Sequence, residues 1–293
     1  MNNNIIEIKN LKKYFGRTKA VDGISFAVKK GEIFGFLGPN GAGKTTTIRC
    51  LMDFIRPVGG SISILGKDAQ TDSVELKEKI GYLPGIVHLY DKWTGREHID
   101  FYEKIRGKSK IVGELLKKFE LDPKPRFKHL SSGNKQKLGL VLALMHEPEI
   151  LVLDEPTISL DPILQNMVLE TLLEFKARGH TVFMSSHNLP EVERVADRVG
   201  IIKLGKMIAV EKVENITKKR IHVIYAYFSG PYKKSDFTGD GIKIFKEMKN
   251  GLVLHVKGDL NPVIAQLKKY KITDLEITHA TLEDVFMEYY NNG

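Results

Sequence analysis

The sequence is short of the features that mark secreted and membrane-spanning chains. It holds a single cysteine, Cys50, among 293 residues, which excludes a disulfide framework and a cysteine metal site within one chain. No apolar run approaches the roughly 20 residues of a membrane span. The N-terminal stretch lacks the basic and then apolar pattern of a signal peptide, and we find neither an internal repeat nor a low-complexity segment. These absences predict a globular protein of the reducing cytosol.

Composition and charge set few limits beyond this. Hydrophobic residues make up 42% and charged residues 28% of the chain, as in ordinary globular proteins, and the length allows one large domain and a small one. The formal net charge of +9 is uneven, because residues 88–140 hold 13 Lys/Arg against 7 Asp/Glu and residues 217–293 hold 12 against 9. A basic excess suits nucleic acid, an anionic membrane surface or solubility alone.

Strand and helix patterns alternate through most of the chain and predict an α/β core. Residues from about 88 to 140 interrupt this alternation as a helical, strand-poor lobe, with one helical pattern from Trp93 to Phe119. We expect strands at Ile5–Ile8, Val21–Val28, Glu32–Leu37, Ser61–Leu65, Ile80–Leu83, Ile150–Leu153, Thr181–Ser185, Val199–Lys203 and Lys206–Val210. We expect helices at Thr46–Phe54, Lys135–Met145, Leu164–Lys176 and Leu189–Ala196.

A polar stretch around residues 211–219 looks like a linker, after which the pattern restarts. We therefore place one domain at residues 1–216 and a small α/β accessory domain at residues 217–293. In the second domain Thr281 is a plausible N-cap for the last helix. Strands are expected at Ile221–Phe228, Leu252–Val256 and Asp274–Thr278, and helices at Pro262–Tyr270 and Leu282–Tyr290.

A glycine-rich loop between an expected strand and an expected helix fits the pattern G-x-x-x-x-G-K-[ST]. Its glycines let backbone N–H groups converge on phosphate oxygens, and the helix that follows adds its positive end. Lys44 is expected to reach the β- and γ-phosphates and Thr45 to ligate Mg²⁺. The nucleotide-binding residues expected here are Gly38, Pro39, Asn40, Gly41, Ala42, Gly43, Lys44, Thr45 and Thr46.

Two carboxylates, Asp154 and Glu155, end the apolar strand Ile150–Leu153. Carboxylates at the carboxyl end of a parallel strand point into the crevice where ligands bind. We expect Asp154 to hold Mg²⁺ and Glu155 to polarise the attacking water, as a general base whose removal typically costs about 10²–10⁴ in rate. The alternative is a solvated acidic turn with no catalytic role.

The segment Leu130-Ser131-Ser132-Gly133-Asn134 precedes this acidic strand by one helix. The three motifs, in this order and spacing, resemble those of the ATP-binding subunits of ABC transporters, whose signature is LSGGQ, over about residues 5–210. The resemblance implies a P-loop NTPase (RecA-like) core with an antiparallel β subdomain and an inserted helical subdomain at about residues 88–140. The ending Thr281–Phe286 is similar to the tail of exporter subunits that carry a small C-terminal α+β domain.

The resemblance also implies roles for single residues. Ser131, Ser132, Gly133 and Asn134 would close over the γ-phosphate held by a partner subunit, and backbone N–H groups at a helix start suit such an anion. His187 would contact the γ-phosphate on its own chain, and Asp161 would lie in the loop that communicates across the dimer. Phe15 would stack on adenine, with the neighbouring Tyr14 and a purely structural core aromatic as alternatives.

Four positions depart from the family pattern. Ser132 and Asn134 replace the first glycine and the glutamine of the signature, and Ser159 stands where the dimer loop usually has glycine. Gly85 stands where the family usually has a glutamine that ligates Mg²⁺ and the attacking water, so we interpret it as a hinge and not as a ligand. The departures bear on how tightly two subunits close and how fast they turn over.

The function that the resemblance implies is that of a transport ATPase subunit. Two copies, identical or pseudo-symmetric, would sandwich two ATP with Mg²⁺. They would drive a separate transmembrane permease at the inner face of the cell membrane, for the export of a drug, peptide or ion. The alternative is a soluble ABC ATPase that acts on nucleic acid or ribosomes, and such a protein usually has two cassettes or a long coiled-coil insertion. This chain has one cassette and no sustained heptads, so we expect no nucleic acid partner. A nucleotide-dependent regulator with little turnover stays open because of Gly85 and Ser132. The accessory domain would either stabilise the dimer or regulate it.

Overall fold

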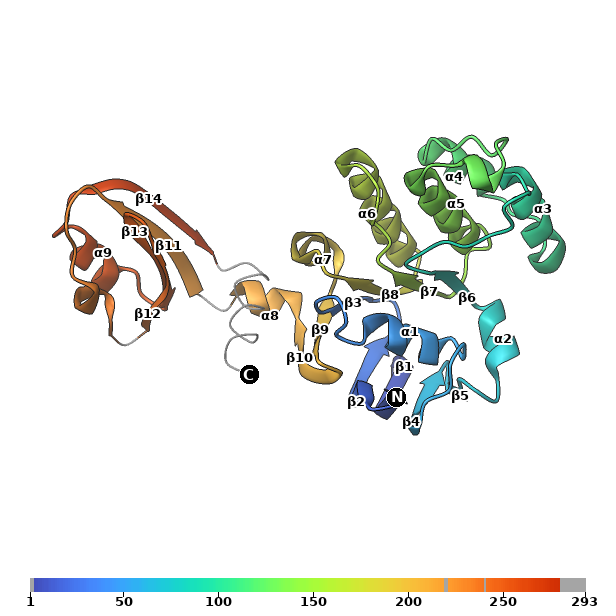
Figure 1. Cartoon of the computed structure of the whole chain (residues 1–293), viewed down its shortest axis with the longest axis horizontal. Coiled ribbons are helices and arrows are strands. Elements are labelled where there is room, and N and C mark those ends of the chain that lie inside the picture. The colour runs from blue at the N-terminus through green and yellow to red at the C-terminus, as the bar shows by residue number, and fades with distance from the viewer. Residues whose placement is uncertain (1–2, 219–220, 240, 280–293) are drawn as a thin grey trace. The chain divides into compact units, whose positions relative to one another are not determined.

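Residues 3–218, 221–239 and 241–279 are described by a computed structural model, in which the chain divides into two compact units, Met1–Val210 and Glu211–Gly293 (Figure 1). The boundary expected after residue 216 falls inside the short helix α8 (Val213–Lys218). The expected helix Leu282–Tyr290, its cap Thr281 and the tail motif lie outside the described residues. No helix in the described ranges is both long and apolar enough to cross a membrane.

A largely parallel sheet forms the centre of the first unit. Its strand order in the described residues is β10-β9-β3-β8-β7-β6, and every residue of β3, β7 and β8 is buried. Because both faces of these strands are buried, their sequences are largely unbroken runs of apolar residues. The strands are β3 Ile33–Leu37, β6 Ile80–Leu83, β7 Ile150–Asp154, β8 Thr181–Ser186, β9 Arg198–Lys203 and β10 Lys206–Lys212.

An antiparallel sheet of order β2-β1-β4-β5 packs against this core. Phe26 of β2 packs against Phe34 and Phe183 of the central sheet, with ring centroids 5.4 and 5.9 Å away. The first two strands are longer than expected, because their outer halves form a hairpin of mostly polar residues that carries no clear apolar alternation. The strands are β1 Asn4–Phe15, β2 Thr18–Lys29, β4 Gly59–Ile64 and β5 Lys67–Asp68.

Helix α1 lies between the two sheets, and α5 and α6 cover the opposite face of the central sheet (Figure 1). Ile48 of α1 belongs to the same buried cluster as Ile6 of β1 and Val152 of β7, which fixes the helix in that layer. Helix α5 begins three residues earlier than expected, so the signature segment forms its first turn. These helices are α1 Lys44–Leu51, α2 Ser73–Glu78, α5 Ser132–Leu144, α6 Pro162–Ala177 and α7 Leu189–Val195.

The inserted lobe is helical, as expected, but it holds two α-helices over the residues for which the sequence predicts one helical pattern. Gly107, at a φ of 89°, ends the first of them, since this backbone conformation is open to glycine and strained for other residues. Thr94 and Glu97 form a capping box that starts the same helix. The elements are α3 Gly95–Arg106, α4 Val112–Lys118 and the 3₁₀ helix η1 Phe127–His129.

The second unit is an antiparallel sheet with helix α9 and the 3₁₀ helix η2 on one face, an α+β arrangement. Its strand order in the described residues is β12-β13-β11-β14. Leu252 and Leu254 of β13 pack with Val263 and Leu267 of α9. Strand β12 was not expected, because its sequence IKIFKEM mixes charges with apolar residues. The elements are β11 Ile221–Phe228, η2 Lys234–Phe237, β12 Ile242–Met248, β13 Gly251–Lys257, α9 Asn261–Leu267 and β14 Ile272–His279.

Candidate functional site

The glycine-rich loop joins β3 to α1 at the carboxyl edge of the central sheet. Two of its glycines have no room for a side chain, because a Cβ at Gly38 would lie 2.4 Å from the carbonyl oxygen of Ile202 and one at Gly43 would lie 2.4 Å from that of Ala20. Gly43 also has a φ of 111°. Within α1, all of which is described, the first turn has no acidic residue and no side-chain cap. Its N–H groups therefore point toward the loop as an anion site.

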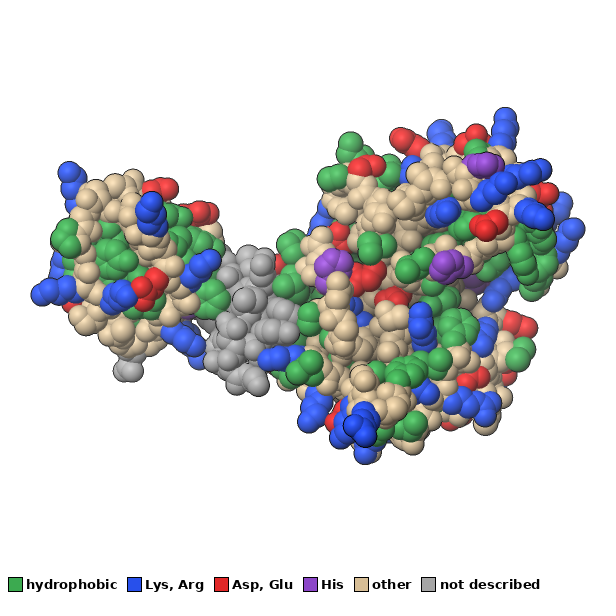
Figure 2. All heavy atoms as spheres, in the orientation of Figure 1, with side chains coloured by type: hydrophobic (Ala, Val, Ile, Leu, Met, Phe, Trp, Pro, Cys, Tyr) green, Lys and Arg blue, Asp and Glu red, His purple; other side chains and the backbone are tan. Residues whose placement is uncertain are grey.

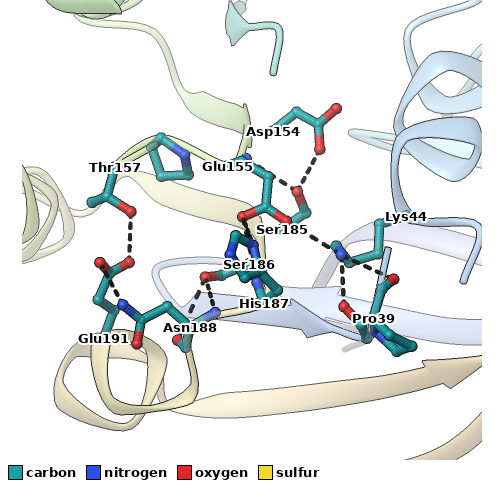
Figure 3. Close-up of polar contacts among 12 residues, drawn as sticks. Pro39, Lys44, Asp154, Glu155, Thr157, Ser185, Ser186, His187, Asn188 and Glu191 are labelled. Carbon is teal, nitrogen blue, oxygen red and sulfur yellow. Dashed lines mark hydrogen bonds and ion pairs between the residues drawn. The ribbon is translucent and has the colours of Figure 1, made fainter. Parts of the chain in front are cut away.

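Lys44 is buried at the mouth of this loop and is 6% exposed. Its ammonium group donates hydrogen bonds to the carbonyl oxygens of Gly38 at 2.6 Å and Pro39 at 3.3 Å, and it lies 3.2 Å from Oε1 of Glu155 (Figure 3). A hollow at this point is lined by Ala20, Pro39, Asn40, Gly41, Gly43, Lys44, Thr45, Thr46 and Glu155. Most of the expected nucleotide-binding residues therefore line one hollow. Gly38 is not among the lining residues, but its carbonyl oxygen accepts a hydrogen bond from Lys44, which is. Ala42 is buried.

Asp154 ends β7 beside Ser185 of β8, its register partner. Asp154 is 1% exposed, and its Oδ1 accepts a hydrogen bond of 2.5 Å from the hydroxyl of Ser185. The same hydroxyl lies 3.2 Å from the backbone nitrogen of Glu155, which also donates to the carbonyl oxygen of Ser185. Ser185 thus holds both acidic residues. No motif in the sequence identifies Ser185, and the only signal is its place near the end of the strand that neighbours Asp154.

Glu155 has a φ of 52°, a left-handed conformation that is uncommon outside glycine and that clusters at functional sites. Its Oε2 lies 2.8 Å from Nδ1 of His187 and accepts a 3.3 Å hydrogen bond from the His187 backbone N–H. Its Oε1 faces Lys44, so the carboxylate bridges Lys44 and His187 (Figure 3). In Figure 2, acidic and histidine side chains lie close together over the ends of β7 and β8. The three residues expected to act at the γ-phosphate are therefore in contact.

A second layer of polar contacts holds the chain after Glu155. The Thr157 hydroxyl donates to Oε2 of Glu191 at 2.6 Å, and the Asn188 amide donates to Oε1 of the same carboxylate at 2.9 Å (Figure 3). Burial raises the pKa of Glu191 above its usual value, and the nearby Glu155 charge adds to this effect. Sequence reasoning did not identify Glu191, because a lone glutamate in the first turn of a short helix is an ordinary helix feature.

The signature segment starts α5. Ser131 is the N-cap, and its hydroxyl accepts a 3.2 Å hydrogen bond from the backbone N–H of Asn134. Ser132 is exposed. A Cβ at Gly133 would lie 3.1 Å from the carbonyl oxygen of Ser159, so the backbones of the two loops approach closely there. Among the described residues that line the phosphate-loop hollow, none comes from this segment.

The residues expected to form the dimer loop are held by hydrogen bonds within the chain. Asp161 is the N-cap of α6, and its Oδ1 accepts hydrogen bonds of 3.0 Å from the backbone N–H groups of Ile163 and Leu164. Ser159 has a φ of 64°. This left-handed backbone gives a physical reason for the glycine that the family usually has at this position.

The two aromatic candidates for stacking differ in their surroundings. Phe15 stands at the end of the β1–β2 hairpin with half of its surface exposed, and the ammonium of Lys13 lies 5.2 Å from its ring centroid. Tyr14 instead donates its hydroxyl to Oδ1 of Asp22 at 2.7 Å. Phe15 is therefore not a core residue, and its ring is open to a ligand while the hydroxyl of Tyr14 is engaged.

Gly85 lies beside Asp154, as a Cβ built on it would be 3.3 Å from Oδ2. Ser185 engages the other oxygen, so Oδ2 faces the space that a side chain at residue 85 would occupy. The described residues contain no cluster of three or more metal-ligating His, Cys, Asp or Glu side chains. A single carboxylate beside a hydroxyl fits Mg²⁺ held largely by phosphate oxygens and water, and it does not suit a fully protein-ligated ion.

Comparisons with known proteins agree with this geometry. The family model described as ABC transporter matches residues 21–158. The chain is 34% identical to the bacitracin transport ATP-binding protein BcrA of Bacillus licheniformis, over 99% of this chain and 98% of that protein. It is 35% identical to the Nod factor export ATP-binding protein I of Burkholderia lata, over 96% and 95%. It is 39% identical to the linearmycin resistance ATP-binding protein LnrL of Bacillus subtilis, over 70% and 68%.

Solved structures extend the likeness to the fold. One described as the ATP-binding subunit of an ABC transporter has a TM-score of 0.67 and 31% identity, covering 73% of this chain and 92% of its own. Another, the ADP conformation of an ATP-binding cassette of an ABC transporter, has a TM-score of 0.61 and 26% identity, covering 73% and 94%. The expected P-loop NTPase fold is confirmed. The chain belongs to the ABC transporter family, and within it to the ATP-binding subunits that act as ATPases.

Proposed function

We propose that this chain powers an exporter by binding and hydrolysing Mg-ATP, with a drug, peptide or ion as the exported substrate and a separate permease as the membrane component. The names of its relatives support export, since they refer to bacitracin transport, Nod factor export and linearmycin resistance. The subunit would then work at the inner face of the cell membrane, held there by the permease.

The phosphate loop binds the nucleotide in this proposal. Lys44 exchanges its contacts with Gly38 and Pro39 for phosphate oxygens, which are stronger partners because they carry full charge. Phe15 offers its exposed ring to the adenine. Thr45 and Oδ2 of Asp154 would hold Mg²⁺, which when bound neutralises charge on the β- and γ-phosphates.

The observation that carries the proposal is the placement of the Glu155 carboxylate between Lys44 and His187. A base here lies beside the cation that reaches the γ-phosphate, so it can accept a proton from water at that phosphate. His187 orients the carboxylate through its ring and its backbone N–H, and its exposed side chain can turn toward the same phosphate.

Two chains complete each ATP site in this proposal. Ser131, Ser132, Gly133 and Asn134 form the start of α5, where the two serines are exposed and the other two residues half-buried. They line no part of their own phosphate-loop hollow, so they can close over the nucleotide of a partner subunit. Asp161 fixes the dimer loop beside them. The partner is a second copy or a homologous subunit.

The helical lobe offers a surface for the permease. Ile86, Tyr90, Phe101 and Ile105 are large apolar side chains with exposed fractions of 40% to 73%, and Trp93 joins Tyr90 and Phe101 with ring centroids 4.6 and 5.5 Å away. Such residues on one lobe mark a protein contact. Lysine and arginine side chains surround this lobe in Figure 2, which suits a position near an anionic leaflet.

The test is Glu155→Gln in the full chain. We expect the variant to bind ATP with Mg²⁺, to lose turnover by about 10²-fold or more and to accumulate as a dimer on size-exclusion chromatography. Lys44→Ala is the control, which should bind ATP about tenfold or more weakly and stay a monomer under the same conditions. A Glu155→Gln variant that hydrolyses ATP at the parent rate would refute the assignment of the base. Equally slow hydrolysis by both would favour a regulator with little turnover.

A further inference from the structure

A buried glutamine connects the signature helix to the catalytic carboxylate. Gln136 lies on α5, five residues after Ser131, and is 4% exposed. Its Nε2 donates hydrogen bonds to two backbone carbonyl oxygens, that of Glu155 at 3.3 Å and that of Pro156 at 3.2 Å. From Leu138 onward the helix is entirely buried and apolar. A polar side chain at such a place costs free energy unless its hydrogen bonds are made, so these two contacts account for its presence.

The contact matters because of the backbone that it fixes. Glu155 is left-handed at a φ of 52°, and a residue in this region stays there only when its surroundings hold it. Pro156 has no N–H to donate, and the carbonyl oxygen of Glu155 also accepts a hydrogen bond of 3.2 Å from the backbone N–H of Ile158 in the same loop. The Gln136 amide meets the carbonyl groups on both sides of this proline, and rotating either peptide group would break a bond.

A second contact ties the same two segments. The first turn of α5 meets the loop after Pro156 where Gly133 lies against the carbonyl oxygen of Ser159. One short length of chain, residues 131–136, therefore holds both the signature segment and the residues that fix Glu155. These contacts join the signature segment directly to the backbone that carries the Glu155 carboxylate.

We propose that Gln136 is a positioning residue that sets the Glu155 carboxylate for hydrolysis and links it to the signature segment serving the partner's ATP. The inference rests on the proposed roles of Glu155 and of residues 131–134. Closure of the signature over one nucleotide then moves the base of the other site, and the two sites are coupled through α5 within each chain, in addition to any contact between chains.

The test is Gln136→Met in the full chain. Methionine keeps the length and volume of the side chain and removes its donors, which leaves two carbonyl groups without this partner. We expect kcat for ATP hydrolysis to fall by roughly 10–100-fold, the scale of a small misplacement of a catalytic group. The Kd for ATP, measured by calorimetry, should stay within about twofold, because the phosphate loop is untouched.

Lys137→Met is the matched control. Lys137 is the next residue of the same helix and is also buried, but its ammonium reaches the carbonyl oxygen of Glu120 at 3.5 Å and not the catalytic loop. It should change kcat by less than about twofold. Gln136→Glu keeps the shape of the parent side chain, but an ionised carboxylate has only acceptors to place against the two carbonyl oxygens. It should therefore lower kcat at least as far as Gln136→Met.

A second measurement tests the link to the signature. In a Glu155→Gln background, Gln136→Met should raise the ATP concentration needed for half-maximal dimer formation by about threefold or more. A Gln136→Met variant with the parental kcat would overturn the inference about Gln136. If Glu155→Gln is inactive in the same assay, the proposed function still stands. If kcat and ATP affinity fall together, Gln136 is structural and the inference also fails. A fully active Glu155→Gln variant would overturn the proposed function itself.

Discussion

The contribution of the Ser185–Asp154 hydrogen bond to the free energy of unfolding can be measured by removing the serine hydroxyl. Ser185→Ala removes a hydroxyl that donates to the buried Asp154 carboxylate at 2.5 Å and lies 3.2 Å from the backbone nitrogen of Glu155. A hydrogen bond to a charged group contributes about 1.5–3 kcal/mol, against about 0.5–1.5 kcal/mol for a neutral pair. We expect Ser185→Ala to lower the free energy of unfolding by about 2 kcal/mol.

The adjacent Ser186 supplies the comparison. It is equally buried on β8, but its hydroxyl accepts a hydrogen bond from the Asn188 backbone N–H at 2.9 Å and meets the Asn188 carbonyl oxygen at 3.4 Å, so it has only neutral partners. Ser186→Ala should cost about 1 kcal/mol. In a unit of this size each kcal/mol shifts Tm by about 2–4 °C, which predicts a visible gap between the two variants.

The assay is thermal unfolding followed by fluorescence, without nucleotide, because a bound ligand would add its own stabilisation. An Asp154→Asn background completes a double-mutant cycle. There a neutral carboxamide replaces the carboxylate, and Ser185→Ala should cost only about 1 kcal/mol, which gives a coupling free energy of about 1 kcal/mol. If Ser186→Ala costs as much as Ser185→Ala, or if the cycle shows no coupling, the charge-assisted bond is not what stabilises this strand end.

Three further changes test other parts of the site. Ser159→Gly relieves a left-handed φ of 64° and should raise the free energy of unfolding by about 0.5–1 kcal/mol, measured by urea denaturation; a loss would contradict it. Lys44→Ala should weaken ATP binding by about tenfold or more, and unchanged binding in calorimetry would remove the loop assignment. Burial raises the pKa of Glu191, so its contribution to stability is largest below the usual glutamate pKa and is lost as pH rises through the folded value. Glu191→Gln should abolish that part of the pH dependence of Tm, and identical profiles would refute it.

Much of the site could be predicted because its chemistry demands particular residues at fixed local spacings. A phosphate loop needs small residues and a lysine within eight positions, and an acidic pair must follow a buried strand directly. Gly38 and Gly43 show why the pattern is so constrained, since a Cβ at either would clash with a backbone carbonyl. Local rules of this kind are visible in a sequence without any knowledge of the fold.

The residues that were missed act across the fold. Gln136, Ser185 and Glu191 reach the loop after β7 from α5, β8 and α7. No local pattern distinguishes them from an ordinary helix glutamine, strand serine or helix glutamate. The hairpin ends of β1 and β2 and the whole of β12 were missed for a related reason. Their residues are held by ladder hydrogen bonds to neighbouring strands, while their side chains lack the apolar alternation on which strand prediction depends.

The loop from Glu155 to Asp161 is held from several sides, and this bears on how it works. Gln136 binds its first two carbonyl oxygens, Gln165 of α6 donates to the carbonyl oxygen of Thr157 at 3.4 Å, and Glu191 accepts the Thr157 hydroxyl. Two of its residues are left-handed without being glycine, at a cost of about 1–3 kcal/mol each. Contacts from three helices can hold such a backbone, and a loop held in this way moves with those helices. In the proposed function, a movement of α5 would therefore act on the proposed base Glu155 and on Ser159 through the same contacts.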